Sequence, residues 1–300
     1  MMSKSPPHHT VDPGCNLLTV DVEDWFHICG VGQWLPRNRW DRLESRVAPN
    51  TLALLDLFDR FQAKATFFVL GWVAERQPDL VREIARRGHE VASHGYRHQR
   101  VYTLSRPDFE RDLNRSLEIL TPLAGRSING YRAPEWSIRR DSLWALDILR
   151  QAGLRYDASM APLPVIGHQD GPRGIHRRRT RYGTLWEVPP LVGPTPWGNL
   201  PVGGGWGLRI FPASLIRFFI RRQNRRHGPA LLFFHPREVD PAPPRLRLPL
   251  VKRFVVSAGL CPTAGRLMAL LQDFRFTTIE NYLAGMIPGA QNQDGAKEKA

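Results

Sequence analysis

The stretch "LLTVDVEDWF" (residues 17–26) decides the fold prediction. It is an apolar run of strand length that ends in three acids, Asp21, Glu23 and Asp24. Other runs rich in Val, Phe and Leu have the composition of buried strands, and they lie at 65–70, 89–94, 185–190 and 230–235. Stretches with apolar residues at helical spacing separate them, and these lie at 48–62, 78–88, 105–125 and 140–153. This alternation predicts an α/β fold with a mainly parallel sheet or barrel.

The chain is predicted to form one domain over residues 15–286. Pro-rich stretches at 189–201 and 241–249 are interpreted as long loops, because strand-like or apolar segments resume after each. The polar ends, residues 1–14 and 287–300, have the composition of disordered tails.

Composition narrows the class of protein. No apolar run in the 300 residues approaches the roughly 20 that would span a bilayer. Cys15, Cys29 and Cys261 show no paired spacing, which is typical of a reducing compartment. The first residues lack the apolar core of a secretory signal, so we expect a cytoplasmic protein. A net charge of +14 favours anionic partners such as nucleic acid, acidic lipid or charged glycan.

A second motif, "GHEVASHGYRHQR" (88–100), places two histidines directly after a predicted strand. His94 and His98 are four positions apart, so on one helical turn they could hold one ion. The alternative is a surface turn that happens to contain two imidazoles. His235 closes another apolar strand-like run, and Arg132 stands before Pro134 in a short turn-like segment. Parallel sheets gather functional groups at the carboxyl ends of their strands, so all these side chains are expected to meet.

The motifs together resemble the polysaccharide deacetylases built on the NodB homology domain, carbohydrate esterase family 4. "GHEVASHGYRH" is similar to the family's His-x-x-x-His motif, "GYRAP" to its Arg-x-Pro motif and "LLFFHP" to its final Leu-x-His motif. The resemblance is closest to the branch of peptidoglycan deacetylase and the allantoinase-like proteins. "DVEDWF" with "HPREVDP" resembles the subgroup linked to exopolysaccharide export loci. The resemblance implies a single-domain, distorted (β/α) barrel.

The resemblance also implies a metal site. Asp21 would be the general base, and His94 and His98 would bind a divalent metal ion with a carboxylate of the first motif. Strand alternation puts Glu23 on the same side as Asp21, so Glu23 is the expected ligand. Asp24 is the rival if the strand ends early. Two imidazoles and one carboxylate suit Zn²⁺, although other divalent ions could fit.

Further catalytic roles follow from the same resemblance. His235 would protonate the departing amine, and Arg132 would hold Asp21 in place. Asp157, in "YDAS", corresponds loosely to a family motif that tunes the acid histidine. A backbone N–H near Pro134 would stabilise the oxyanion.

Aromatic and basic segments suggest contacts with a substrate or a surface. Trp25 and Trp136 flank catalytic motifs, and Trp206 lies in a Gly-rich stretch at 201–212. Each could stack on a sugar, and each could equally be a packed core residue. The helix pattern at 215–228 combines an apolar face with several arginines. It predicts either a peripheral contact with an anionic membrane or a packed helix with a solvated basic face.

The expected function is a metal-dependent hydrolase that removes N-acetyl groups from sugar units of a bacterial polysaccharide or its precursor. One alternative keeps the fold but changes the substrate to a non-glycan amide, as in allantoinase-like or deformylase-like proteins. Another is a basic nucleic-acid-binding protein. That alternative is disfavoured because the arginines are scattered and no recognised binding module is present.

Overall fold

The computed structural model describes residues 14–286 except for 29, 165, 169, 245–247 and 261. Both predicted tails lie outside the described residues, apart from Gly14. Their disorder therefore stays a prediction. Among the described residues, no helix combines the length and the apolar content that a membrane span requires.

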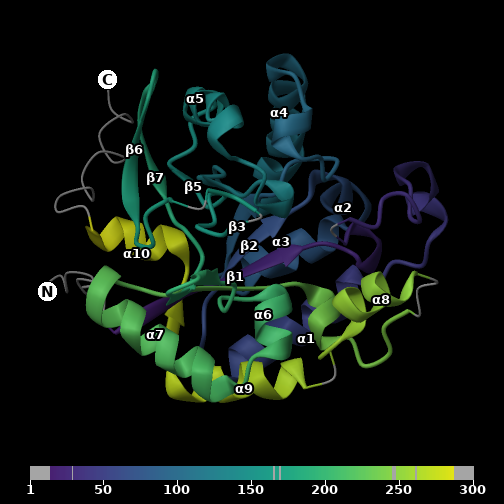
Figure 1. The fold of residues 1–300 in the computed structure, drawn as a ribbon. Coiled ribbons are helices and arrows are strands. Elements are labelled where there is room, and N and C mark those ends of the chain that lie inside the picture. Colours follow the sequence, from purple (N-terminus) through teal and green to yellow (C-terminus); the bar gives the residue numbers. More distant parts are fainter. Residues whose placement is uncertain are drawn as a thin grey trace, which may run out of the picture.

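The sheet is mainly parallel, as the sequence predicted (Figure 1). Its strand order is β10 (Leu231–Phe234), β1 (Cys15–Val22), β2 (Thr66–Val69), β3 (Glu90–Ser93), β4 (Gly130–Tyr131), β5 (Tyr156–Asp157), β7 (Gly183–Glu187) and β6 (His176–Thr180). All of these neighbours pair in parallel except β6 and β7, and β11 (Arg275–Thr277) adds a second parallel partner to β1. The α/β fold is confirmed. Among the described residues, no ladder joins β6 to β10, so hydrogen bonding does not close the predicted barrel.

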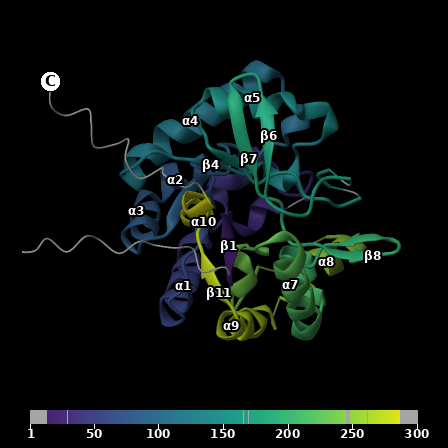
Figure 2. The same cartoon turned by 90° about the vertical axis from the view of Figure 1, so that its left-hand side faces the viewer.

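Helices surround the sheet (Figures 1 and 2). They are α1 (Val47–Arg60), α2 (Gly71–Arg76), α3 (Pro78–Arg86), α4 (Arg106–Ala124), α5 (Trp144–Gln151), α6 (Gly205–Ile210), α7 (Ala213–His227), α8 (Leu250–Ser257), α9 (Thr263–Asp273) and α10 (Ile279–Met286). Local chemistry sets the bounds of α4, because the Ser105 side chain accepts a hydrogen bond from the N–H of Asp108 at its start. Gly125 then ends the helix in the left-handed conformation, with φ of 67°.

The apolar side chains of β1 and β2 lie at the centre of the core. Leu18 and Val20 of β1 and Phe67 of β2 are fully buried, and helices α1, α3 and α4 add apolar side chains to the same cluster. Since both faces of these strands are covered, their sequences are almost continuously apolar. This burial fixes the register of β1, and with it the positions of the acids that follow.

Several elements were not predicted. Strands β4 and β5 contain two residues each, so no periodicity can reveal them. Strand β6 is "HRRRT", an edge strand whose charged side chains alternate between exposed and half-buried positions. The Pro-rich stretch at 189–201 is not only a loop, because it contains a hairpin of β8 (Gly193–Thr195) and β9 (Gly198–Leu200).

Candidate active site

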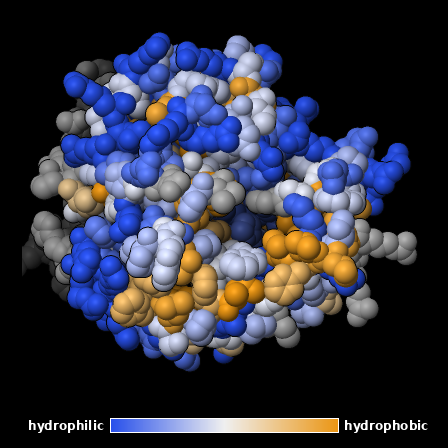
Figure 3. Space-filling model, in the orientation of Figure 1, coloured by the Kyte–Doolittle hydropathy of each residue, from blue (hydrophilic) through white to orange (hydrophobic). Residues whose placement is uncertain are grey.

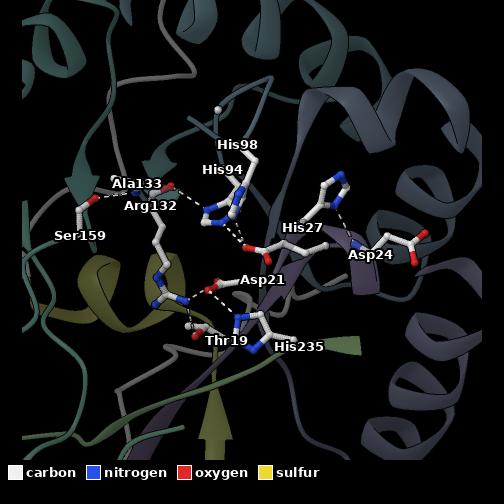
Figure 4. Close-up of polar contacts among 12 residues, drawn as sticks. Thr19, Asp21, Asp24, His27, His94, His98, Arg132, Ala133, Ser159 and His235 are labelled. Carbon is white, nitrogen blue, oxygen red and sulfur yellow. Dashed lines mark hydrogen bonds and ion pairs between the residues drawn. The ribbon is translucent and has the colours of Figure 1, made fainter. Parts of the chain in front are cut away.

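The carboxyl ends of neighbouring strands bring the predicted residues together (Figure 4). The site side chains are Asp21 and Glu23 at the end of β1, His94 after β3, Arg132 after β4 and His235 after β10. All of them are buried except His235, which is partly exposed. His98 is buried beside them, four positions beyond His94 in a non-helical segment.

Glu23 joins the two histidines. Its Oε1 lies 2.7 Å from Nε2 of His94 and 2.9 Å from Nε2 of His98, across 71 and 75 positions of sequence. The three candidate ligand atoms lie within 4.8 Å of one another. Burial raises the pKa of Glu23, but the charge and hydrogen bonds of the histidines outweigh it and hold that pKa well below its usual range. Glu23, His94 and His98 therefore converge as the sequence predicted.

The donor set fits a divalent metal ion. Nδ1 of His94 lies 2.8 Å from the carbonyl oxygen of Arg132. A carbonyl oxygen only accepts, so Nδ1 carries the hydrogen, and in a neutral ring Nε2 presents its lone pair to Glu23. A lone pair at this distance from a carboxylate oxygen needs a cation or a proton between them. Two imidazole nitrogens and one carboxylate oxygen are ligands that Zn²⁺ accepts with positions left open.

Arg132 fixes the carboxylate of Asp21 by a hydrogen bond. Its Nη1 donates to Oδ1 of Asp21 at 2.6 Å and to Oγ1 of Thr19 at 2.9 Å. The guanidinium is 1% exposed and lies 4.1 Å from the ring centroid of Phe68 and 4.6 Å from that of Trp136. A guanidinium fixed by hydrogen bonds and aromatic faces gives the carboxylate one orientation. The predicted contact between Arg132 and Asp21 is therefore present.

His235 faces Asp21 from the end of β10, the strand that pairs with β1. Its Nε2 lies 3.9 Å from Oδ2 of Asp21, and its Nδ1 lies 3.6 Å from Oε1 of Glu238. Glu238 belongs to the turn η6 (Pro236–Val239), which directly follows the histidine. Burial lowers the pKa of His235, but Glu238, with smaller effects of Glu23 and Asp21, outweighs it and raises that pKa to about 9.

Asp157 does not have the predicted role. The carboxylate beside His235 is that of Glu238, whereas Asp157 accepts a hydrogen bond from Oγ of Ser159. That Oγ in turn accepts from the N–H of Ala133 at 2.7 Å, so Asp157 and Ser159 support the segment after β4. Burial raises the pKa of Asp157 to about 6. The loose match to the family motif therefore marks a structural carboxylate.

Asp24 is not a metal ligand, and this part of the prediction is wrong. Its Oδ2 accepts from Oγ of Ser45 at 2.6 Å, and its carboxylate also accepts from the N–H groups of Arg46 and Val47. Figure 4 shows the side chain pointing away from the other site residues. Strand β1 ends at Val22, and Asp24 then turns toward the start of α1.

The predicted aromatic contacts divide into two groups. Trp25 donates its Nε1–H to the carbonyl of Glu44 and does not line the cavity that contains Asp21, Glu23 and His235, so its substrate contact stays a prediction without support from this cavity. Trp136 lines the cavity, although it is only 7% exposed, and Trp206 lines it with 37% exposure. Pro134 begins the turn η4 (Pro134–Trp136) that forms part of the cavity wall.

The cavity has a volume of about 320 Å³ and is lined mainly by apolar residues around Asp21, Glu23 and His235. The backbone of the chain is strained at three residues in or near the site. Glu135 and Trp136 have φ of 55° and 53°, and His98 has φ of 51°. Non-glycine residues in this region cost about 1–3 kcal/mol and gather at functional sites. The strained backbone thus lies in the same region as the candidate catalytic side chains.

The sequence alone assigned no role to two residues of the site. Glu238 lies three positions after His235 within the quoted motif, and this spacing is the signal that could have found it. Thr19 donates to the carbonyl of Leu232 at 2.9 Å and accepts from Arg132. A buried threonine within an apolar strand gives no comparable signal.

Known protein families match two parts of the chain. Residues 40–156 match the polysaccharide deacetylase family, and residues 158–284 match a domain of unknown function, DUF3473. A peptidoglycan deacetylase from Helicobacter pylori is 33% identical over 107 residues, 36% of this chain and 36% of that protein. A chitooligosaccharide deacetylase from Sinorhizobium fredii is 34% identical over 102 residues, 33% of this chain and 44% of that protein. The matches thus span less than half the length of these relatives.

Solved structures extend the likeness to most of the chain, for the fold alone. A protein from Mycobacterium smegmatis described as a polysaccharide deacetylase has a TM-score of 0.60 at 21% identity and covers 91% of this chain and 88% of its own. An allantoinase has a TM-score of 0.58 at 13% identity and covers 94% of both chains. Residues 40–156 therefore match the polysaccharide deacetylase family, and they lie within a fold that the chain shares with these solved structures.

Proposed function

We propose that the protein is a metal-dependent hydrolase that removes N-acetyl groups from sugar units of a bacterial polysaccharide, such as an exopolysaccharide, or its precursor. The observation that carries the proposal is the donor set of Glu23, His94 and His98, whose Glu23 lines one cavity together with Asp21 and His235. The curated relatives named as deacetylases of peptidoglycan and chitooligosaccharide support this substrate class.

Glu23, His94 and His98 would hold the metal ion, and Zn²⁺ is the proposed ion because of the ligand types. When bound, such an ion supplies a Lewis acid that activates water and polarises the acetyl carbonyl. The chain's own residues provide the proton transfers and the positioning.

Asp21 would accept the proton of the attacking water. The hydrogen bond from Arg132 fixes one oxygen of this carboxylate, while the other oxygen faces His235. One fixed orientation of the base lowers the entropy cost of reaching the transition state.

His235 would donate a proton to the amine nitrogen as the C–N bond breaks. With a pKa raised to about 9, the ring is an imidazolium at neutral pH and has a proton to give. Proton transfer by a positioned group contributes roughly 10²–10⁴-fold to the rate. Asp21 and His235, whose side chains lie 3.9 Å apart, would therefore serve as the base and the acid of the reaction.

The amide of Glu135 is the proposed oxyanion donor. Pro134 has no N–H, and the N–H of Trp136 donates to the carbonyl of Ala133 at 3.1 Å. The strained φ of Glu135 lies in the cavity wall next to these residues. One such donor contributes roughly 3 kcal/mol to transition-state stabilisation.

Metal content and acetate release from N-acetylated chitooligosaccharides test the proposal together. We expect the native protein to bind about one divalent ion per chain and to release acetate, because its three ligands converge. His94→Ala should lose both properties. His227→Ala, at the exposed end of α7, is the matched control and should keep both. Unchanged metal content and acetate release in His94→Ala would reject the site, and ring opening of a cyclic ureide without acetate release would reject the substrate class.

A further inference from the structure

Exposed apolar side chains border the mouth of the catalytic cavity. On α8, Leu250, Val251, Phe254 and Val255 are 73%, 78%, 62% and 45% exposed. Trp197, in the turn between β8 and β9, is 92% exposed. Two further members, Ile166 and Trp206, are 42% and 37% exposed. We call these seven residues the apolar rim.

The apolar rim is continuous with the catalytic cavity, because Ile166, Trp206 and Val255 line it. Figure 3 shows hydrophobic residues beside a hollow in this face, over the position of α8 in Figure 1. In Figure 2, the β8–β9 hairpin projects on the same side of the molecule. The rim therefore lies where a substrate would enter.

Contacts with the rest of the protein hold α8 and the hairpin in place. On α8, Val256 is buried against Val31 and Leu248, while the neighbouring apolar residues face outward. The hairpin is held by Asn199, whose Nδ2 donates to the carbonyl of Pro162 at 2.7 Å. The exposed side chains are thus carried by packed elements.

The helix that the sequence suggested for a membrane contact, α7, is mainly a packed helix. Its Ile216 and Ile220 are fully buried, and Phe219 is 6% exposed. Its apolar face therefore belongs largely to the core. The exposed apolar surface at the cavity mouth is instead the apolar rim, which α8, the hairpin, Ile166 and Trp206 form.

The position of the rim restricts what can cover it. A second copy of the chain seated there would close the mouth of the cavity to the substrate. A bilayer surface that carries the substrate would bring it to the mouth and cover the apolar side chains at the same time. The occupant that suits the site is therefore a membrane.

Charge favours an anionic membrane. Arg253 is exposed on α8, Lys252 is partly exposed, and the chain carries a net charge of +14. Helices at bilayer surfaces combine basic residues with Phe and Leu in this way, and Trp is enriched at the interface. Basic residues near anionic lipid headgroups add electrostatic attraction.

We propose that the apolar rim docks the protein on an anionic bilayer, and that its glycan substrate is presented there in lipid-linked form. The second part rests on the proposed function, whereas the docking does not. The glycan would then reach Asp21 and His235 from the bilayer side, with its lipid chain remaining in the membrane.

Vesicle sedimentation tests the docking. The native protein should bind vesicles of phosphatidylcholine and phosphatidylglycerol at 3:1 at least tenfold more tightly than phosphatidylcholine alone. Leu250→Gln/Val251→Gln/Phe254→Gln should weaken binding to the mixed vesicles at least tenfold. The control Leu52→Gln/Tyr182→Gln changes side chains that are 37% and 52% exposed away from the rim and should bind as the native protein does. In Figure 2, α1, which carries Leu52, lies on the side opposite to the hairpin.

Three outcomes would overturn the docking: no vesicle binding by the native protein, equal binding by the triple variant, or a native dimer that the triple variant dissociates in sedimentation velocity. Acetate release from a soluble chitooligosaccharide should be the same in the native protein and the triple variant. That assay separates the two proposals, because it reports on the proposed function alone. If docking holds, acetate release from a lipid-linked N-acetylated sugar in mixed vesicles should fall at least tenfold in the triple variant, and equal rates would reject lipid-linked presentation.

Discussion

Glu238 gives His235 a permanent negative neighbour. Burial raises the pKa of Glu238, but His235 and Arg209 outweigh this effect and hold that pKa below its usual range. Arg209 Nε lies 3.7 Å from Oε1 of Glu238, and both residues line the cavity. The carboxylate is therefore ionised at neutral pH and keeps the imidazole charged.

Replacing Glu238 by Gln should reduce turnover and shift its pH dependence. The Gln side chain keeps an acceptor for the N–H of His235 but removes the charge that raises the histidine's pKa from 6.5 to about 9. We expect kcat at pH 8 to fall roughly tenfold or more. The alkaline limb of the kcat profile should move to lower pH, while KM and metal content stay unchanged.

Glu44→Gln is the control for this change, because its side chain is 81% exposed and lies outside the cavity. Its pH profile should match that of the native protein. If Glu238→Gln retained the native alkaline limb, the role assigned to Glu238 would be wrong.

Single residues of the site were predictable where their chemistry is local. His94 and His98 could be paired from spacing, and Asp21 and His235 from their places after apolar runs. The choice between Glu23 and Asp24 was not predictable, because it depends on where β1 ends and how the chain then turns.

At the scale of elements, Asp24 links the end of β1 to the start of α1. Its carboxylate accepts from the N–H groups of Trp25, Arg46 and Val47 and from the hydroxyl of Ser45. Most of these donors are at least partly buried, so leaving them without a hydrogen-bond acceptor would destabilise the fold. Asp24 therefore stabilises the connection that positions the first motif.

Asp24→Ala should destabilise the protein and leave the metal site filled. Loss of the shared acceptor should lower the free energy of unfolding by roughly 2 kcal/mol, measured by urea denaturation. Glu23→Gln should instead lose the metal ion while its free energy of unfolding stays close to that of the native protein. Metal loss in Asp24→Ala with retention in Glu23→Gln would show that the two carboxylates had been assigned the wrong way round.

Elements were predictable in proportion to their length. The patterns at 48–62 and 105–125 correspond to α1 and α4, because several turns reveal a helical period. Strands β4 and β5 carry Arg132 and Ser159 at their ends, yet two residues contain no period. Their pairing is decided by neighbouring strands far away in sequence.

At the scale of the whole molecule, Glu90 connects distant elements. It accepts from Oγ1 of Thr66 in β2, from the hydroxyl of Tyr156 in β5 and from the N–H of Glu280 in α10. Burial, with the nearby charge of Glu280, raises its pKa to about 7. The folded protein thus prefers the protonated form of this carboxyl.

Stability should therefore fall as pH rises through this window. The pKa of Glu90 is 4.5 when unperturbed and about 7 in the folded chain, so its contribution to the free energy of unfolding is greatest below pH 4.5. About 3 kcal/mol should be lost by pH 7. Glu90→Gln should remove this part of the slope in urea denaturation measured from pH 4.5 to 8. An unchanged slope would show that Glu90 does not titrate there.

The overall architecture was predictable because alternating strands and helices leave few topologies. The position of β11 was not, because a strand of three residues at the far end of the chain is too short to show a period.

The place of β1 in the sheet has a consequence for biosynthesis. The hydroxyl of Thr19 in β1 donates a hydrogen bond to the carbonyl of Leu232 in β10, which lies 213 positions later in the sequence. At roughly 5–20 residues per second, a ribosome needs about 10–40 s to add the missing neighbour. Until then the nascent chain carries an apolar strand with one edge bare, and Asp21 has no His235 opposite it. Chains stalled before residue 225 should accordingly be cleaved by protease within β1, whereas released chains resist.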